Sequence, residues 1–262
     1  MNWMKKVAVA LVCLLPLGLQ AAKVDTLQVK SPSMNKSIEV VVVSPDVAAT
    51  KACPVIYLLH GYGGNARTWV GIKPDLSKIA DEKGIFFVCP DGKNTWYWDS
   101  PLNADVRYET FISDELVKYV DSHYKTVADR KGRAITGLSM GGHGAMWNGL
   151  RHSDVFSAAG STSGGVDIRP FPKNWEMSVQ IGEKAKYPEN WEKYTVINLV
   201  PTLRKDQIAL IFDCGDSDFF LEVNKNYHEA LLKQGIDHDF ITRPGNHDSQ
   251  SVSYTHLRAH ET

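Results

Sequence analysis

The stretch of sequence that decides the fold is A-I-T-G-L-S-M-G-G-H-G-A, residues 134–145. It contains the pattern G-x-S-x-G, in which Gly137 and Gly141 flank Ser139. In this pattern the serine lies on a strained, sharp turn between a strand and a helix, and glycines flank it because larger side chains would collide with the turn. The helix that follows directs free N–H groups and the positive end of its dipole at charge developing near the serine. The stretch predicts that Ser139 is a nucleophile and that the N–H of Met140 is one oxyanion donor.

Strand-like and helical patterns alternate on both sides of this stretch. Residues 54–59 and 85–89 are continuous apolar runs that end next to histidine-glycine or proline, which is typical of buried parallel strands. Together with the serine turn, this alternation predicts an α/β-hydrolase fold with a mostly parallel sheet and helices on both faces. We expect strands at 37–44, 54–59, 85–89, 131–136, 155–159, 209–214 and 238–242, and helices at 75–83, 108–124, 144–151 and 221–234.

The length and composition set limits on function. The chain has 262 residues, is 43% hydrophobic and has a formal net charge of −1, so it can bury a sizeable core. Its near-neutral charge gives no indication of nucleic acid or an anionic membrane as a partner. The four cysteines and the histidines show no zinc-binding spacing. We therefore expect no metal, no cofactor and no disulfide framework.

The two ends of the chain differ from the part between them. Residues 1–22 have a basic start, an apolar run at 7–19 and a small-residue end, which is the pattern of a signal peptide. The run is short for a transmembrane span, with an uncleaved anchor as the alternative. We expect removal of this segment, export to the periplasm or the extracellular space, and a catalytic domain at 23–249. Residues 250–262 have little apolar periodicity and resemble translated non-coding sequence, with a genuine short tail as the alternative.

Polar residues follow the carboxyl ends of the predicted strands, where ligands bind in parallel sheets. In this fold the catalytic residues occur along the chain in the order serine, acid, histidine. His247 follows the last predicted strand and is the candidate base. Asp213, Asp216 and Asp218 are the candidate acids; Asp213 belongs to the end of the strand at 209–214, whereas Asp216 and Asp218 lie on the loop proper. Position alone leaves the choice between Asp216 and Asp218 open.

The segment 167–202 breaks the alternation and is predicted to be an insertion over the active-site edge. Such long connections are usually lids or binding loops. We expect its Trp175 and Trp191, together with Trp96 from the loop after residues 85–89, to bind substrate by stacking on a sugar ring or an aromatic acyl group. The alternative is a structural excursion with its own small core, in which the tryptophans anchor the loop.

Further motifs extend the pattern from about residue 37 to residue 249, and with them the chain resembles the putative esterase family of α/β-hydrolases. This family includes esterase D, tributyrin esterases, feruloyl and acetyl xylan esterases and, more distantly, mycolyltransferases. The resemblance implies that Asp218 is the catalytic acid and that the backbone of Tyr62 is the second oxyanion donor. The matching motifs are L-L-H-G-Y-G-G-N at 58–65 with Trp69, P-D-G at 90–92, W-Y at 96–97, D-S-P at 99–101, Y-E at 108–109, the serine motif at 137–145, C-G at 214–215, D-F at 218–219, P-G at 244–245 and H-D at 247–248.

The resemblance implies a serine carboxylesterase in which Ser139, Asp218 and His247 hydrolyse short-chain or carbohydrate-linked esters, and the signal-peptide pattern implies that it is exported. Acetyl, feruloyl and short aliphatic groups are the expected acyl groups. Three alternatives remain: an acyltransferase of the mycolyltransferase type, a thioesterase like S-formylglutathione hydrolase, and a non-catalytic carbohydrate-binding scaffold. The expected partner is a small-molecule or polysaccharide ester, without nucleic acid and without stable membrane insertion.

Overall fold

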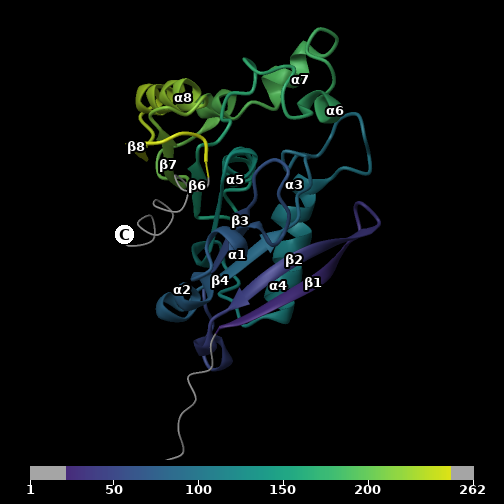
Figure 1. Ribbon diagram of the computed structural model, residues 1–262, viewed down its shortest axis with the longest axis vertical. Helices are drawn as coiled ribbons and strands as arrows, with labels where there is room; N and C mark the ends of the chain where they lie inside the picture. The colour runs from purple at the N-terminus through teal and green to yellow at the C-terminus, as the bar shows by residue number, and fades with distance from the viewer. Residues whose placement is uncertain (1–21, 249–262) are drawn as a thin grey trace, which may run out of the picture.

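The computed structural model describes residues 22–248, and one eight-stranded sheet runs through them (Figure 1). The strand order is β1-β2-β4-β3-β5-β6-β7-β8. The pairs β1–β2 and β2–β4 are antiparallel, and β3 to β8 are parallel to one another, so the prediction of a mostly parallel sheet is confirmed. The strands are β1 (Lys23–Ser31), β2 (Lys36–Ser44), β3 (Val55–Leu59), β4 (Phe86–Pro90), β5 (Arg133–Gly137), β6 (Ala158–Thr162), β7 (Ala209–Gly215) and β8 (Asp239–Arg243).

Helices cover both faces of the sheet (Figure 1). The α-helices are α1 (Thr68–Ile72), α2 (Leu76–Lys83), α3 (Tyr108–Thr110), α4 (Leu116–His123), α5 (Met140–Arg151), α6 (Met177–Ile181), α7 (Pro188–Lys193) and α8 (Leu221–Gln234). A π-helical turn, η2 (Phe111–Glu115), joins α3 to α4. Residues 22–248 also contain the 3₁₀ turns η1 (Asp46–Ala49), η3 (Arg130–Gly132) and η4 (Val196–Thr202).

The central strands send alternate side chains into two separate cores, as the two-residue period of a strand requires. In β3, Ile56 and Leu58 face the smaller core, which α1 and α2 cover. Tyr57 and Leu59 face the larger core, which α4, α5 and α8 cover. All five residues of β3 are buried, and this explains why the strand is continuously apolar in the sequence.

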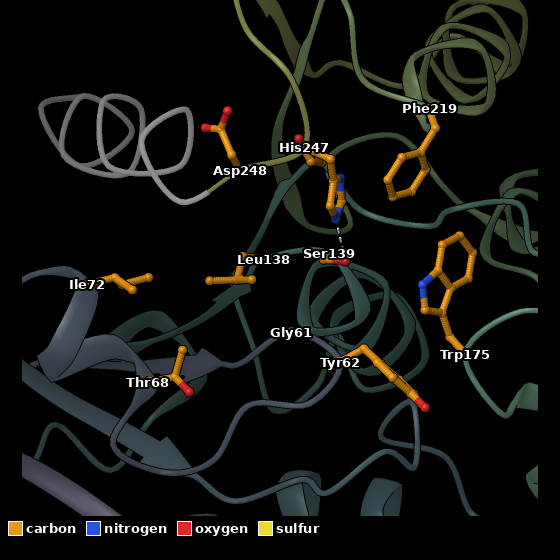
Figure 2. A pocket seen from close by; sticks show the side chains of 11 residues that line it. Gly61, Tyr62, Thr68, Ile72, Leu138, Ser139, Trp175, Phe219, His247 and Asp248 are labelled. Carbon is orange, nitrogen blue, oxygen red and sulfur yellow. Dashed lines mark hydrogen bonds between the residues drawn. The ribbon is translucent and has the colours of Figure 1, made fainter.

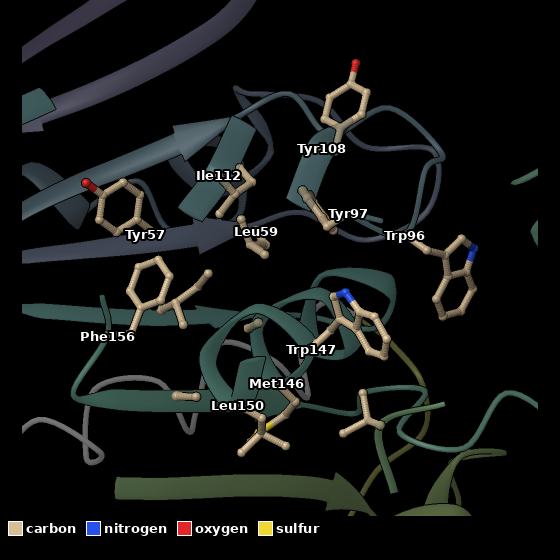
Figure 3. Packing of buried hydrophobic residues seen from close by; sticks show 14 of the residues in the cluster. Tyr57, Leu59, Trp96, Tyr97, Tyr108, Ile112, Met146, Trp147, Leu150 and Phe156 are labelled. Carbon is tan, nitrogen blue, oxygen red and sulfur yellow. The ribbon is translucent and has the colours of Figure 1, made fainter. Parts of the chain in front are cut away.

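The larger core fixes helix α5 against the sheet (Figure 3). Trp147 and Leu150 of this helix are buried, and the ring of Tyr57 meets that of Phe156 edge-on with centroids 5.7 Å apart. Burial of each such side chain stabilises the fold by roughly 1.5–3 kcal/mol. The amino end of α5, directly after Ser139, is therefore held in place by packing along the rest of the helix.

Several element boundaries differ from the sequence predictions. The strand expected at 155–159 is β6 and begins three residues later, because Val155 and Phe156 donate backbone hydrogen bonds to His152 in the turn after α5. Strand β1 was not predicted. The helix expected at 108–124 is present, but as α3, η2 and α4 in succession. Helix α8 has the predicted bounds.

The predictions for the chain ends fall largely outside the described residues. The signal peptide at 1–22 reaches the described part only at Ala22, and the tail at 250–262 does not reach it. The domain boundaries therefore stay predictions. Within residues 22–248, the helices are all too short or too polar to cross a bilayer.

Candidate active site

Ser139 lies in the turn between β5, which ends at Gly137, and α5, which begins at Met140. Its backbone has φ 55° and ψ −116°, a conformation that residues with side chains rarely adopt. A Cβ on Gly137 would lie 2.3 Å from the carbonyl oxygen of Gly141, and a Cβ on Gly141 would lie 2.2 Å from that of Leu59. The backbone at this turn thus leaves room only for glycine on both sides of the serine.

Three side chains that are far apart in the sequence meet at this turn (Figure 2). His247 lies in the loop after β8, and its Nε2 is 2.8 Å from Oγ of Ser139. Its Nδ1 is 2.8 Å from Oδ2 of Asp218, which lies in the loop after β7. With its proton on Nδ1, His247 donates to the carboxylate and accepts from the serine hydroxyl. This sequence of contacts matches the geometry of a Ser-His-Asp triad.

The environment of Asp218 keeps its carboxylate ionised. The Asp218 side chain is fully buried, whereas that of His247 is 22% exposed. Burial acts to raise the pKa of Asp218, but hydrogen bonds from His247 and from the N–H of Phe220, 2.8 Å from Oδ1, outweigh it, and the pKa is lowered. The other two candidate acids, Asp213 and Asp216, hydrogen-bond to different groups.

The two predicted oxyanion donors flank the serine. Met140 follows it directly, and the loop that carries Tyr62 passes beside it: a Cβ on Gly61 would lie only 3.4 Å from the Cβ of Ser139. Within residues 22–248, neither the Tyr62 nor the Met140 N–H donates a backbone hydrogen bond. The two groups therefore stay candidates for binding a negative charge that forms next to Ser139.

His60 holds this loop in place from inside the protein. Its ring is buried; Nδ1 donates to the carbonyl of Gly61 at 2.7 Å, and Nε2 accepts the N–H of Gly92 at 2.9 Å. The hydroxyl of Tyr97 donates to the carbonyl of His60 at 3.0 Å. The loops after β3 and β4 are thereby fixed to each other, and this explains why their motifs occur together.

A cavity of about 400 Å³ opens at Ser139 and His247 (Figure 2). The rings of Trp175 and Phe219 stack with centroids 5.4 Å apart, and the centroid of Phe219 lies 4.3 Å from that of His247. Among the described residues, the lining includes the acid Asp248 but no lysine or arginine. The cavity suits an uncharged, partly apolar ligand. Thr68, Ile72 and Leu138 line one side of it, and Tyr62, Trp175 and Phe219 line the other.

The structure places only one of the three predicted substrate-binding tryptophans at this cavity. Trp175 lines it, at a strained turn with φ 47°. Trp96 is buried, and its indole N–H donates to the carbonyl of Trp175 at 3.2 Å. Trp191 is also buried, and its indole N–H donates to the carbonyl of Gly182 at 2.9 Å. The expectation that Trp96 and Trp191 stack on substrate is corrected, because neither ring is accessible.

Several lining residues were missed by the sequence predictions. Phe219 and Leu138 directly adjoin Asp218 and Ser139, so proximity in the sequence was a usable signal for both. Ile72 had no such signal, because it lies on the short helix α1, which was not predicted.

Comparison with known proteins identifies the family. The sequence profile described as "Putative esterase" matches residues 31–253. The chain belongs to the putative esterase family. It is 26% identical over 211 residues to an acetyl esterase of Caldicellulosiruptor saccharolyticus, which covers 74% of this chain and 76% of that protein. It is 26% identical over 250 residues to an esterase of Mycobacterium tuberculosis, with 84% of this chain covered. The chain spans 54% of that second relative, which is about half its length.

The fold of this chain also matches that of a solved esterase. A ferulic acid esterase aligns with a TM-score of 0.78 and 29% sequence identity, covering 91% of this chain and 96% of that one. The chain therefore has the α/β-hydrolase fold predicted from its sequence, and it is a carboxylic ester hydrolase.

Proposed function

We propose that this chain is a serine carboxylesterase that hydrolyses short-chain or carbohydrate-linked esters through Ser139, His247 and Asp218. The observation that carries the proposal is the pair of 2.8 Å contacts at His247, one to the Ser139 hydroxyl and one to the Asp218 carboxylate, at the opening of an apolar cavity. Nucleophile, base and acid occupy the roles that acyl transfer requires.

In the proposed mechanism, Nε2 of His247 takes the proton of Ser139 as its Oγ attacks the ester carbonyl. The N–H groups of Tyr62 and Met140 stabilise the oxyanion, and Asp218 stabilises the imidazolium that forms. His247 then gives its proton to the departing alcohol, which leaves an acyl group on Ser139. Water attacks this acyl-enzyme with the same base, and the acid is released.

The cavity lining supports uncharged esters as substrates. Trp175 and Phe219 offer flat apolar faces to an acyl group or a sugar ring. Relatives named acetyl esterase and ferulic acid esterase fit the same substrate classes. A glutathione thioester carries carboxylates, and the described lining offers no lysine or arginine to bind them. The geometry therefore favours carboxylic esters over that alternative.

We also propose that the enzyme acts outside the cytoplasm after removal of residues 1–22. The start of β1 at Lys23 supports a mature domain that begins at this point. The test is to express residues 1–262 in a bacterial host and to determine the amino-terminal sequence of the exported protein. A new terminus at Ala22 or Lys23 is expected, whereas an intact Met1 in the membrane fraction would show an uncleaved anchor.

A substrate panel tests the activity. Hydrolysis of p-nitrophenyl acetate, butyrate and octanoate and of methyl ferulate is measured, with S-formylglutathione as the competing class. Ser139→Ala should lower ester hydrolysis by about 10⁶-fold. Ser122→Ala, at an exposed serine of α4, is the matched control and should leave the rates unchanged.

Three outcomes of this panel would contradict the proposal. Near-normal activity of Ser139→Ala would refute the serine mechanism, and no turnover of any ester by the unmodified chain would indicate a non-catalytic scaffold. Transfer of the acyl group to a sugar acceptor in preference to water would indicate an acyltransferase.

A further inference from the structure

The position of His247 depends on the strand at the edge of the sheet. Strand β8 pairs with β7 on one side and is the last strand in the sheet order. Three of its five residues are exposed, and among the described residues Phe240 is the side chain of β8 that packs against the larger core. Segments with few buried contacts open locally at low free-energy cost. Asp218 follows the end of β7 and His247 follows the end of β8, so any movement of β8 relative to β7 changes the distance between them.

A buried ion pair connects these two strands just before the catalytic loops. Nε of Arg243, at the end of β8, donates to Oδ1 of Asp213 in β7 at 2.8 Å. Arg243 pairs with Gly215 in the sheet register, so its side chain reaches back diagonally to Asp213. The side chains are only 12% and 5% exposed, and solvent therefore screens this pair much less than a surface pair.

Asp213 also contacts the strand beside the nucleophile. Its Oδ2 accepts the hydroxyl of Thr162, in β6, at 3.0 Å, and its carbonyl accepts the N–H of Ser163 at 2.8 Å. The carbonyl of Thr162 in turn accepts the N–H of Ser139 at 2.9 Å. One carboxylate thus connects the strand that leads to His247 with the segment that holds the nucleophile.

Backbone contacts continue this connection into the two loops. The N–H of Asp216 donates to the carbonyl of Arg243 at 2.8 Å, and the N–H of Ser217 donates to that of Gly245 at 3.1 Å. Oδ1 of Asp216 accepts the N–H of Gly245 at 3.2 Å. A Cβ on Gly215 would lie 2.3 Å from the carbonyl oxygen of Gly245, so the loops are in direct contact. Asp218 and His247 therefore extend from two loops that β7 and β8 align.

We propose that Asp213 and Arg243 are positioning residues that hold Asp218, His247 and Ser139 at their catalytic distances. Neither residue touches the reacting atoms; they act by fixing β8 and its loop to β7 and β6. The proposal rests on the proposed serine mechanism. A displacement of a catalytic group by about 1 Å can cost about 10²-fold in rate. Loss of the ion pair should therefore lower kcat by about 10- to 100-fold.

The test compares Arg243→Met and Asp213→Asn with Arg133→Met in the full chain. Arg133, at the amino-terminal end of the central strand β5, forms an ion pair with Asp121. The two side chains are 10% and 16% exposed, so Arg133 is a matched control for burial and charge. His247 serves both acylation and deacylation, so a displaced His247 should slow both steps and leave KM nearly unchanged. Arg133→Met should lower the melting temperature without lowering kcat.

A double variant and an activity-independent signal complete the test. Asp213→Asn combined with Arg243→Met should lose no more kcat than the worse single variant, because both changes break the same contact. The proton between His247 and Asp218 should give a downfield ¹H NMR resonance that weakens in Arg243→Met and persists in Arg133→Met. If Arg243→Met does not fold, Arg243→Lys replaces it, because it keeps the charge and loses the planar guanidinium.

The outcomes separate the two proposals. If Ser139→Ala stays active, the serine mechanism fails, and the NMR resonance alone decides whether Arg243 positions His247. The positioning role is overturned if Arg243→Met lowers kcat by less than about fivefold, or by no more than Arg133→Met, with an unchanged resonance.

Discussion

Replacement of Asp218 by asparagine tests the triad at its most specific contact. In the structure, Oδ1 accepts the N–H of Phe220 and Oδ2 accepts the Nδ1 proton of His247, each at 2.8 Å. An asparagine side chain has one oxygen and one NH₂ group. The N–H of Phe220 needs the oxygen, so the NH₂ group faces Nδ1 and donates to it. His247 then carries its proton on Nε2 and cannot take the proton of Ser139.

The expected loss follows from this change of tautomer. An equivalent Asp→Asn change in serine proteases lowers kcat by about 10⁴-fold, which corresponds to about 5 kcal/mol of transition-state stabilisation. The assay is the initial rate of p-nitrophenyl acetate hydrolysis near neutral pH, with circular dichroism to verify folding. Asp218→Asn should show the full loss with little change in KM.

The matched control is Asp216→Asn in the same loop. Asp216 is exposed, and its Oδ1 accepts the N–H of Gly245 at 3.2 Å, a contact that the carbonyl oxygen of asparagine preserves. Its kcat should therefore stay within a few-fold of the unmodified chain. A larger loss in Asp216→Asn than in Asp218→Asn would refute the reasoning and make Asp216 the acid.

Substitutions at Gly141, at two tryptophans and at His143 test the packing around the site. Gly141→Ala should lower both activity and melting temperature, because its Cβ would lie 2.2 Å from the carbonyl oxygen of Leu59. Trp191→Ala should destabilise the fold by about 3–5 kcal/mol in chemical denaturation with little effect on KM, whereas Trp175→Ala should raise KM for methyl ferulate more than for p-nitrophenyl acetate. Burial lowers the pKa of His143 to about 4, so its contribution to stability is present above its ordinary pKa and is lost as the pH falls toward 4. In chemical denaturation, the free energy of unfolding of the unmodified chain should fall by about 3 kcal/mol between pH 7 and pH 4 through this group. The His143→Gln variant should not show this part of the fall.

The sequence predicts those parts of the fold that depend on local patterns. The pattern of glycines around Ser139 identifies the turn, although the backbone that requires Gly141 belongs to Leu59 of the neighbouring strand β3, and helix α8 follows from its own periodicity. Strand β1 was missed although Leu27, Val29 and Ser31 are increasingly buried at every second position. The alternation of apolar Leu27 and Val29 with polar residues was therefore a usable signal for a strand. It follows closely after residue 22, where the signal peptide was predicted to end. The displaced β6 shows that an apolar run alone does not fix where a strand begins.

The tryptophans show where sequence patterns become insufficient. Trp175 and Trp191 lie in the same segment, 167–202, which was interpreted either as a substrate-binding lid or as a structural excursion. Each interpretation applies to one tryptophan: Trp175 lines the cavity, whereas Trp191 is buried. A signal for Trp191 existed, because it lies three residues from the buried Tyr194, a spacing that places both on one helical face. Trp175 is only partly buried and lies in a left-handed turn with Glu176, a conformation that no local pattern predicts for these residue types.

Asp213 in β7 and Asp216 and Asp218 in the loop after it differ in function because their partners come from a distant part of the chain. Asp213 meets Arg243, 30 residues away in sequence, and Asp218 meets His247, 29 residues away. Asp216 remains at the surface between the same two loops. The parallel register of β7 and β8 brings these partners together, and the positions of the aspartates in the sequence do not encode that register. For this reason the sequence pattern alone left Asp216 and Asp218 equivalent, and the family resemblance was needed to choose between them. Because the same register brings Asp213 to Arg243 and Asp218 to His247, a change that loosens the first contact should also disturb the second.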